Sequence, residues 1–196
     1  MNKLILTTSI FFITIFSFGQ KNSVNAALES PWTIGAGVNF IHNNGLHLAN
    51  GTDFENWNFK NPFIVSVEKR LINYLAAGAT ISINTLEENN LQNNIYLDKN
   101  LPFFAIDLAG KFYYDQFILP TYQLNFFEGY ILTGLGYTSY GSEGTVTFNA
   151  GLGFQFWLLN DRSIGLRLQS VGKWGSESIV LKNYIEHSIE IVWRFF

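Results

Sequence analysis

The amino-acid sequence predicts an all-β protein in which eight antiparallel strands form an up-and-down barrel. Three observations lead to this prediction. First, eight segments of roughly ten residues alternate apolar with small or polar side chains, a period of two that is typical of strands. Second, after residue 20 the chain holds no run of about 18 apolar residues, so we expect no membrane-spanning helix. Third, the 196 residues are 17% aromatic and only 14% charged.

The composition excludes several classes of protein. Disordered chains are poor in aromatic residues and rich in charge, and a disulfide scaffold needs cysteine, which this chain lacks. The formal net charge is −3, from 12 Lys and Arg against 15 Asp and Glu, so we expect no nucleic-acid partner. Soluble domains carry roughly 25% charged residues, and the low charge here therefore indicates an unusually apolar surface.

The first segment of the chain has the pattern of a secretory signal peptide. Lys3 supplies a positive charge, an apolar run follows at 4–18, and Ser17 and Gly19 place small residues before a cleavage site at Gln20. This run is shorter than the ~20 residues that a spanning helix needs. We therefore expect a signal peptide at residues 1–19, a short segment at 20–30 and the barrel at 31–196.

In the first half of the chain, four segments place apolar side chains at every second position. These are 32–41 (apolar from Trp32 to Phe40), 63–70 (Phe63 to Val67), 74–83 (Leu75 to Ile83) and 104–112 (Phe104 to Phe112). The positions between them carry small or polar residues such as Gly35, Glu68, Thr80 and Asp107. Each segment is therefore predicted to be a strand with one apolar face.

The second half of the chain repeats the pattern four more times. The segments are 128–137 (apolar from Ile131 to Tyr137), 146–156 (Val146 to Phe156), 164–169 (Ile164 to Leu168) and 185–195 (Ile185 to Phe195). Residues such as Gly134, Gly151, Arg167 and Glu190 stand between the apolar ones. An even number of antiparallel strands suits a closed up-and-down barrel.

The connections between these strands alternate in length. Residues 71–73 and 159–163 are predicted tight turns, whereas 42–61, 85–102 and 172–183 are long and rich in Asn, Gly, Glu and Lys. The stretch 115–126 lies on the short side but has about twelve residues. Long connections on one side and mostly short turns on the other are the pattern of outer-membrane barrels.

The alternation alone does not say which face of the strands points inward. A soluble barrel or a sandwich would bury the apolar face, whereas a membrane barrel would expose it to lipid. The other face, however, is rich in Gly and Ala, and its few charges nearly balance. An eight-stranded barrel is just wide enough inside for side chains to fill it. We therefore predict a transmembrane barrel with apolar residues facing lipid and an ion network in the lumen. This network comprises Glu68, Arg70, Asp107, Lys111, Glu128, Arg167, Glu186, Glu190 and Arg194.

Aromatic residues gather at the predicted strand ends. On the short-turn side these are Trp32, Tyr114, Phe127, Trp157, Trp193 and Phe195, and on the long-loop side Phe40, Tyr137, Trp174 and Tyr184. Two such groups are typical of the aromatic girdles that mark the two membrane interfaces. The girdles favour the membrane barrel over a soluble one.

Three stretches carry a resemblance to a known family. The run 144–157 (GTVTFNAGLGFQFW), the run 165–169 (GLRLQ) and the closing 186–196 (EHSIEIVWRFF) resemble the OmpA-type eight-stranded barrels of Bacteroidota. The resemblance implies that Trp193, Phe195 and Phe196 form the C-terminal signal read by the barrel-assembly machinery. Because the chain stops at Phe196, we expect the barrel alone, without the peptidoglycan-binding domain of full-length OmpA-family proteins.

We expect no catalytic, cofactor-binding or metal-binding residues. Adjacent strand residues face opposite ways, so His187 and Ser188 are not expected to form a catalytic pair. His42 and His47 share a long loop with Asp53 and Glu55, but their spacing matches no metal-ligand motif.

The first long loop also carries Trp57 and Phe59 among Asn, Asp and Gly. Aromatic residues in a polar surface loop form either a binding patch or a cap packed on the barrel rim. We leave both interpretations open at the sequence level.

The sequence thus predicts a small, monomeric, non-enzymatic protein of the cell outer membrane. We expect a structural role in the envelope or surface interaction through extracellular loops, with at most a small gated pore. Its expected partners are outer-membrane lipids and lipopolysaccharide, the assembly machinery and an envelope complex. The alternatives are a lipid A-modifying enzyme on the same scaffold and a secreted soluble barrel that binds an apolar ligand.

Overall fold

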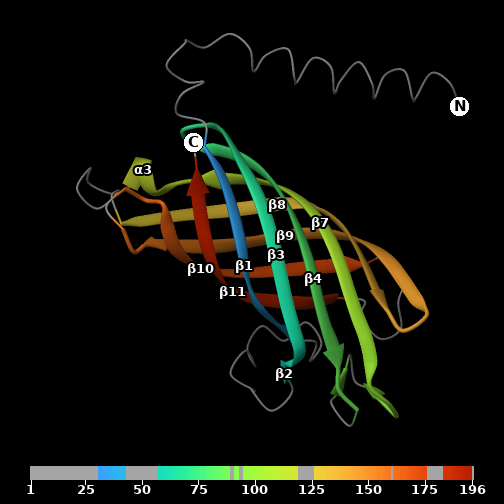
Figure 1. The fold of residues 1–196 in the computed structure, drawn as a ribbon. Helices are drawn as coiled ribbons and strands as arrows, with labels where there is room; N and C mark the ends of the chain where they lie inside the picture. The colour runs from blue at the N-terminus through green and yellow to red at the C-terminus, as the bar shows by residue number, and fades with distance from the viewer. Residues whose placement is uncertain are drawn as a thin grey trace, which may run out of the picture.

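A computed structural model describes residues 31–42, 57–88, 91–92, 95–118, 126–159, 161–175 and 183–195 (Figure 1). The predicted signal peptide, the segment 20–30, His47, Asp53, Glu55 and Phe196 lie outside these residues. The described elements are β1 (Trp32–His42), β2 (Trp57–Asn58), β3 (Lys60–Ile72), β4 (Leu75–Leu86), β5 (Leu91–Gln92), β6 (Ile95–Tyr96), β7 (Leu101–Tyr113), α3 (Asp115–Ile118), β8 (Phe127–Tyr140), β9 (Glu143–Trp157), β10 (Ile164–Gly175) and β11 (Asn183–Phe195).

Eight long strands form one antiparallel sheet that closes on itself. The order is β11-β10-β9-β8-β7-β4-β3-β1, and β11 also pairs with β1 from Trp32↔Phe195 to His42↔Ile185. In Figure 1 the strands run obliquely around the barrel, with β1 and β11 side by side. Closure removes the exposed sheet edges that would otherwise pair with other chains. The predicted fold class is confirmed.

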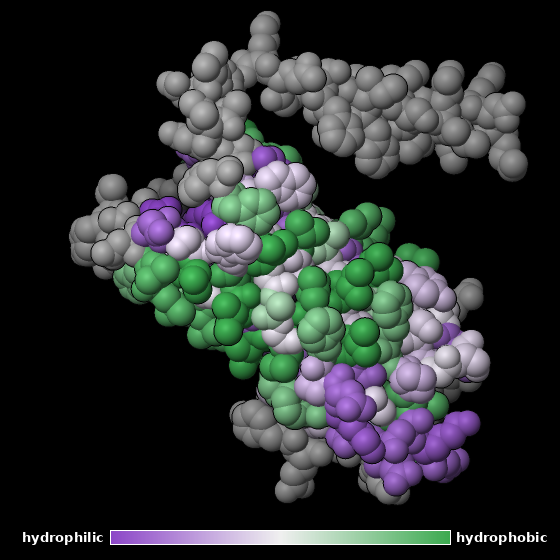
Figure 2. All heavy atoms as spheres, viewed as in Figure 1, coloured by the Kyte–Doolittle hydropathy of each residue, from purple (hydrophilic) through white to green (hydrophobic). Residues whose placement is uncertain are grey.

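The two faces of the strands have opposite chemistry. Leu108 and Ile191 are each 66% exposed on the outer wall, whereas Arg167 is 0% and Glu190 1% exposed inside. Figure 2 shows a broad band of hydrophobic residues across the middle of the face in view, with hydrophilic residues at both ends of the barrel. Such an apolar band flanked by polar ends suits a barrel wall in contact with acyl chains. None of the helices in the described residues is long and apolar enough to cross a membrane.

The strands are longer than the sequence pattern predicts. β10 continues to Gly175, through residues that the prediction assigned to a loop at 172–183. It continues because it is paired on both sides, with Gly172 opposite Ala150 of β9 and Ile185 of β11. Glycine and lysine have low strand propensity, but cross-strand pairing overrides that preference.

The two ends of the barrel differ in their connections, and we call them the short-turn end and the loop end. The short-turn end holds the β3–β4 turn, the β7–β8 connection with α3, and the β9–β10 turn. There Ser163 donates its backbone N–H (3.0 Å) and its hydroxyl (2.7 Å) to the Asp161 carboxylate, which lowers the pKa of that carboxyl. The loop end also contains one tight turn, between β8 and β9, where Gly141 adopts a φ of 57°.

An irregularity interrupts the ladder between β1 and β3 toward the loop end. Their pairing stops at Gly37↔Ile64, because β3 is bulged at Asn61, whose φ is 57°, and at Pro62, which has no N–H. The Asn84 side-chain amide takes over as donor to the carbonyl oxygens of Asn39 (3.1 Å) and Asn58 (3.2 Å). A side chain thus supplies hydrogen bonds to backbone carbonyl groups beside the interrupted ladder.

Candidate functional site

The structure places all nine residues of the predicted ion network on the inner face of the barrel. They come from β3, β7, β8, β10 and β11, so that strands from all around the wall contribute. A tenth charged residue, Lys173 of β10, lies among them and is 2% exposed. Among the described residues, the inner faces of the strands therefore carry five acidic groups (Glu68, Asp107, Glu128, Glu186, Glu190) and five basic groups (Arg70, Lys111, Arg167, Lys173, Arg194).

Glu68 is the centre of the contacts in the middle of the lumen. Its carboxylate accepts hydrogen bonds from Lys111 Nζ (2.8 Å), Arg167 Nη2 (3.0 Å) and the Tyr113 hydroxyl (2.5 Å). Arg167 also donates to Gln155 (3.0 Å), and its guanidinium lies 3.9 Å from Glu190. Buried charges persist only when they are paired and hydrogen-bonded, and each charge here has such partners.

Glu128 organises a second group of contacts at the short-turn end. Arg194 donates to both of its carboxylate oxygens, at 2.8 and 3.2 Å, and Arg70 donates at 3.1 Å. The Arg194 guanidinium also lies 4.0 Å from the centre of the Trp157 ring. Trp157 is therefore inside the barrel, 5% exposed, and its prediction as a girdle residue is wrong. It occupies the inward position of the alternation and provides a cation–π surface there.

Lys173 joins two acidic groups toward the loop end. Its Nζ lies 2.6 Å from both Asp107 and Glu186. Asn149 donates to Asp107 and Asn39 donates to Glu186, each at 2.8 Å. Lys173 is absent from the predicted network because the alternating pattern predicts a strand that ends at residue 169, whereas β10 continues to Gly175. The signal was present, since Lys173 follows Arg167 at an even spacing and so shares its face.

Tyr184 also lies inside the barrel rather than in the outer girdle predicted for it. It is 4% exposed, and its hydroxyl lies 2.6 Å from that of Thr138. Other members of the girdles do face outward, among them Trp32 and Trp193 at the short-turn end and Trp174 at the loop end. Like Trp157, Tyr184 stands at a position of its strand that points into the barrel. Its closeness to the strand end does not change that direction.

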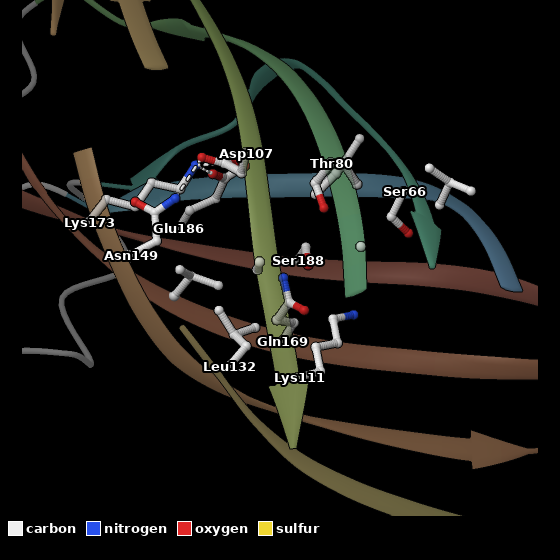
Figure 3. Close-up of a pocket in the computed structure, with 15 residues that line it drawn as sticks. Ser66, Thr80, Asp107, Lys111, Leu132, Asn149, Gln169, Lys173, Glu186 and Ser188 are labelled. Carbon is white, nitrogen blue, oxygen red and sulfur yellow. Dashed lines mark hydrogen bonds and ion pairs between the residues drawn. The ribbon is translucent and has the colours of Figure 1, made fainter. Parts of the chain in front are cut away.

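A small cavity lies between the residues in contact with Glu68 and those in contact with Lys173. The cavity measures about 30 Å³ and is lined by Lys111 and Gln169 on one side and by Asp107 and Lys173 on the other (Figure 3). A cavity needs roughly 10–15 Å³ to hold one water molecule, so this one accommodates about two. Two glycines leave room for larger side chains in the lumen. A side chain at Gly136 would collide with Asp107, and one at Gly153 would collide with Tyr130.

The other candidate residues do not assemble into a catalytic or metal site within the described part of the chain. His187 points outward and stacks on Trp57 (4.9 Å between ring centres), while Ser188 is 4% exposed on the inner face. His42 is buried, and no group of three potential metal ligands occurs among the described residues. Of the two interpretations of Trp57 and Phe59, packing is observed, since both rings contact Phe40 on the outer wall.

The barrel is similar in structure to solved outer-membrane proteins. No family model and no curated protein matches the sequence. Among solved structures, the N-terminal β-barrel domain of Pseudomonas aeruginosa OprF is similar over 84% of this chain and 97% of its own length, with a TM-score of 0.53 and 12% identity. The Neisserial surface protein A (NspA) is similar over 84% of this chain and 95% of its own, with a TM-score of 0.52 and 11% identity. The chain therefore has the closed eight-stranded β-barrel fold of these OmpA-type outer-membrane proteins.

Proposed function

We propose that the protein is a small, non-enzymatic, monomeric barrel of the outer membrane that contributes to envelope integrity or to surface interaction through its loops. The observation that carries the proposal is the filling of the lumen by five acidic and five basic groups, which leave a cavity of about 30 Å³. A wall that presents hydrocarbon outward and paired ions inward is suited to a bilayer and leaves no room for bulk transport.

The partners we propose follow from the two surfaces of the barrel. The apolar wall is suited to outer-membrane lipids, with lipopolysaccharide in the leaflet nearest the loop end. The barrel-assembly machinery is proposed as a partner during biogenesis, and an envelope complex as a partner of the loops. We propose no catalytic role, because the wall separates His187 from Ser188 and a nucleophile and its base must lie within hydrogen-bond reach.

The closed lumen predicts very little conductance. Purified protein in a planar bilayer should give long silent periods and at most small, brief openings, because ions would have to pass through the Glu68 and Lys173 groups. A large and steady open-pore current would contradict the proposal. The matched variant Lys173→Ala, which removes the side chain that joins Asp107 to Glu186, should open more often than the wild-type protein.

Changes at Phe196 are expected to impair assembly of the barrel. Deletion of Phe196, or the substitution Phe196→Asp, should sharply lower the amount of barrel that reaches the outer membrane, because the C-terminal aromatic residue is the proposed signal for assembly. The substitution Phe196→Tyr preserves an aromatic end and should assemble normally. Membrane fractionation with immunodetection measures all three, and normal assembly of the Asp variant would refute the role of this residue.

A further inference from the structure

The described part of the β7–β8 connection packs against the outside of the barrel. The ring of Phe117 in α3 stacks on Phe112, an outward residue of β7, with 5.7 Å between the ring centres and 11° between the ring planes. The same ring meets Tyr74 of the β3–β4 turn edge to face, at 5.9 Å between centres. In Figure 1, α3 lies beside the wall at the short-turn end. The start of this connection therefore belongs to the outer surface.

Gly129 gives the chain room to leave β7 along the outer surface. Tyr114, between β7 and α3, donates its backbone N–H to the Gly129 carbonyl oxygen at 3.0 Å. A side chain at Gly129 would collide with the Tyr114 ring, so the ring occupies the space that this side chain would fill. Gly129 stands two positions before Ile131, which is 53% exposed, and therefore shares its outward face. Tyr114 thus covers the outer face of β8.

The exposed side of α3 is apolar. Ile118 is 71% exposed, the highest value among the large apolar side chains of the described residues, and Phe117 is 64% exposed. The one charged residue of α3, Asp115, is 5% exposed and interacts electrostatically with Arg70 and Glu128 of the lumen. Apolar residues exposed next to a larger apolar surface mark a contact with another protein or with a membrane.

Continuity with the outer wall favours the membrane. Phe112 is the last outward residue of β7 and follows Ile106 and Leu108, which are 42% and 66% exposed. Through the stacked rings, α3 extends this row, which is suited to acyl chains. A partner protein on Phe117 would also have to cover the adjoining wall, which the bilayer occupies. Aromatic and apolar residues at the end of a lipid-facing row are typical of the boundary between acyl chains and headgroups.

We propose that Phe117 and Ile118 form an interfacial anchor, which inserts into the leaflet nearest the short-turn end at the boundary between acyl chains and headgroups. The partner of this surface is the bilayer itself, in the glycerol region that any glycerophospholipid provides. The inference rests on the proposed function, because the anchor needs a barrel that spans the membrane. It accounts for a connection that is longer than the other turns at the same end.

Site-directed fluorescence tests the anchor, since the chain has no cysteine. Ile118→Cys is labelled with the environment-sensitive probe NBD and reconstituted into phosphatidylcholine liposomes, in which part of the lipid carries a nitroxide near the top of one acyl chain. This lipid should quench the probe severalfold more than it quenches probes at Asp161→Cys, an exposed position at the same end, and at Ser142→Cys at the loop end. Iodide on both sides of the bilayer should give the opposite order, because water reaches the two control positions.

A second pair of variants tests the packing that positions the anchor. In the labelled Ile118→Cys protein, Phe112→Leu removes the ring on which Phe117 stacks and should clearly lower the quenching by the nitroxide lipid. The matched control is Phe104→Leu, because Phe104 faces outward on the same strand, nearer the loop end. It should leave the quenching unchanged. Equal quenching in the two variants would contradict the role of the stacked rings.

A probe at Ile118 that iodide quenches and the nitroxide lipid does not would overturn the proposal, because the residue would then lie in water. A probe shielded from both quenchers would overturn it too, since protein would then cover the residue. If Ile118→Cys does not insert, Phe117→Cys carries the same test. Flotation with the liposomes measures insertion separately. A wild-type protein that does not insert would refute the proposed membrane function, whereas an inserted barrel with Ile118 in water refutes the anchor alone.

Discussion

Replacing Glu68 by alanine is expected to lower the free energy of unfolding by about 3–5 kcal/mol, the cost of breaking a buried ion pair by removing one partner. The substitution leaves Lys111 and Arg167 without the carboxylate that both contact, and Tyr113 loses its hydrogen-bond acceptor. Lys111 is 6% and Arg167 0% exposed, so water does not readily replace the missing carboxylate. Urea unfolding in liposomes, followed by the shift of the folded barrel on an unheated gel, measures the loss.

Two controls separate charge from volume and from general effects. Glu68→Gln keeps the side-chain volume and removes only the charge. It should therefore destabilise the barrel nearly as much as Glu68→Ala does. Glu88→Ala removes a carboxylate from an exposed position and should change stability by less than about 0.5 kcal/mol. If Glu68→Ala were as stable as Glu88→Ala, the ion network would not hold the lumen together.

The substitution Leu108→Arg tests which face of the barrel meets lipid. Leu108 is 66% exposed near the middle of β7 and lies opposite Ala79 and Leu135 on the outer wall. An arginine facing the middle of a bilayer costs about 2–4 kcal/mol, whereas the same change on a water-facing surface stays within about 0.5 kcal/mol. We therefore expect a clear loss in liposome unfolding measurements.

The matched control for Leu108→Arg is Ser142→Arg in the exposed β8–β9 turn. It adds the same charge outside the predicted hydrocarbon band and should be nearly neutral. Equal stability of the two variants would mean that the apolar wall does not contact acyl chains, and the soluble alternative would then be favoured.

Much of the fold could be predicted because the face of each strand is a local property. A residue two positions along a strand points the same way, so the outward Phe148 and Leu152 and the inward Gln155 are recognisable without any knowledge of their neighbours. Strand ends were less predictable. β10 reaches Gly175 only because β9 and β11 supply hydrogen-bond partners on both sides, and its composition near Gly172 resembles that of a loop.

The errors inside the barrel have two different causes. Trp157 and Tyr184 were assigned to the girdles by their closeness to a strand end, although their parity places them inward. Lys173 was not predicted because the predicted strand ended before it. Lys173 is the fifth basic group of the network and forms ion pairs with both Asp107 and Glu186.

The sequence by itself determined which residues share a face, because the pleat of a strand sets that alternation over two residues. Only the tertiary structure decided which charges meet. Glu68 contacts Lys111 and Arg167, which lie 43 and 99 residues away along the chain, because closure of the sheet sets every register together.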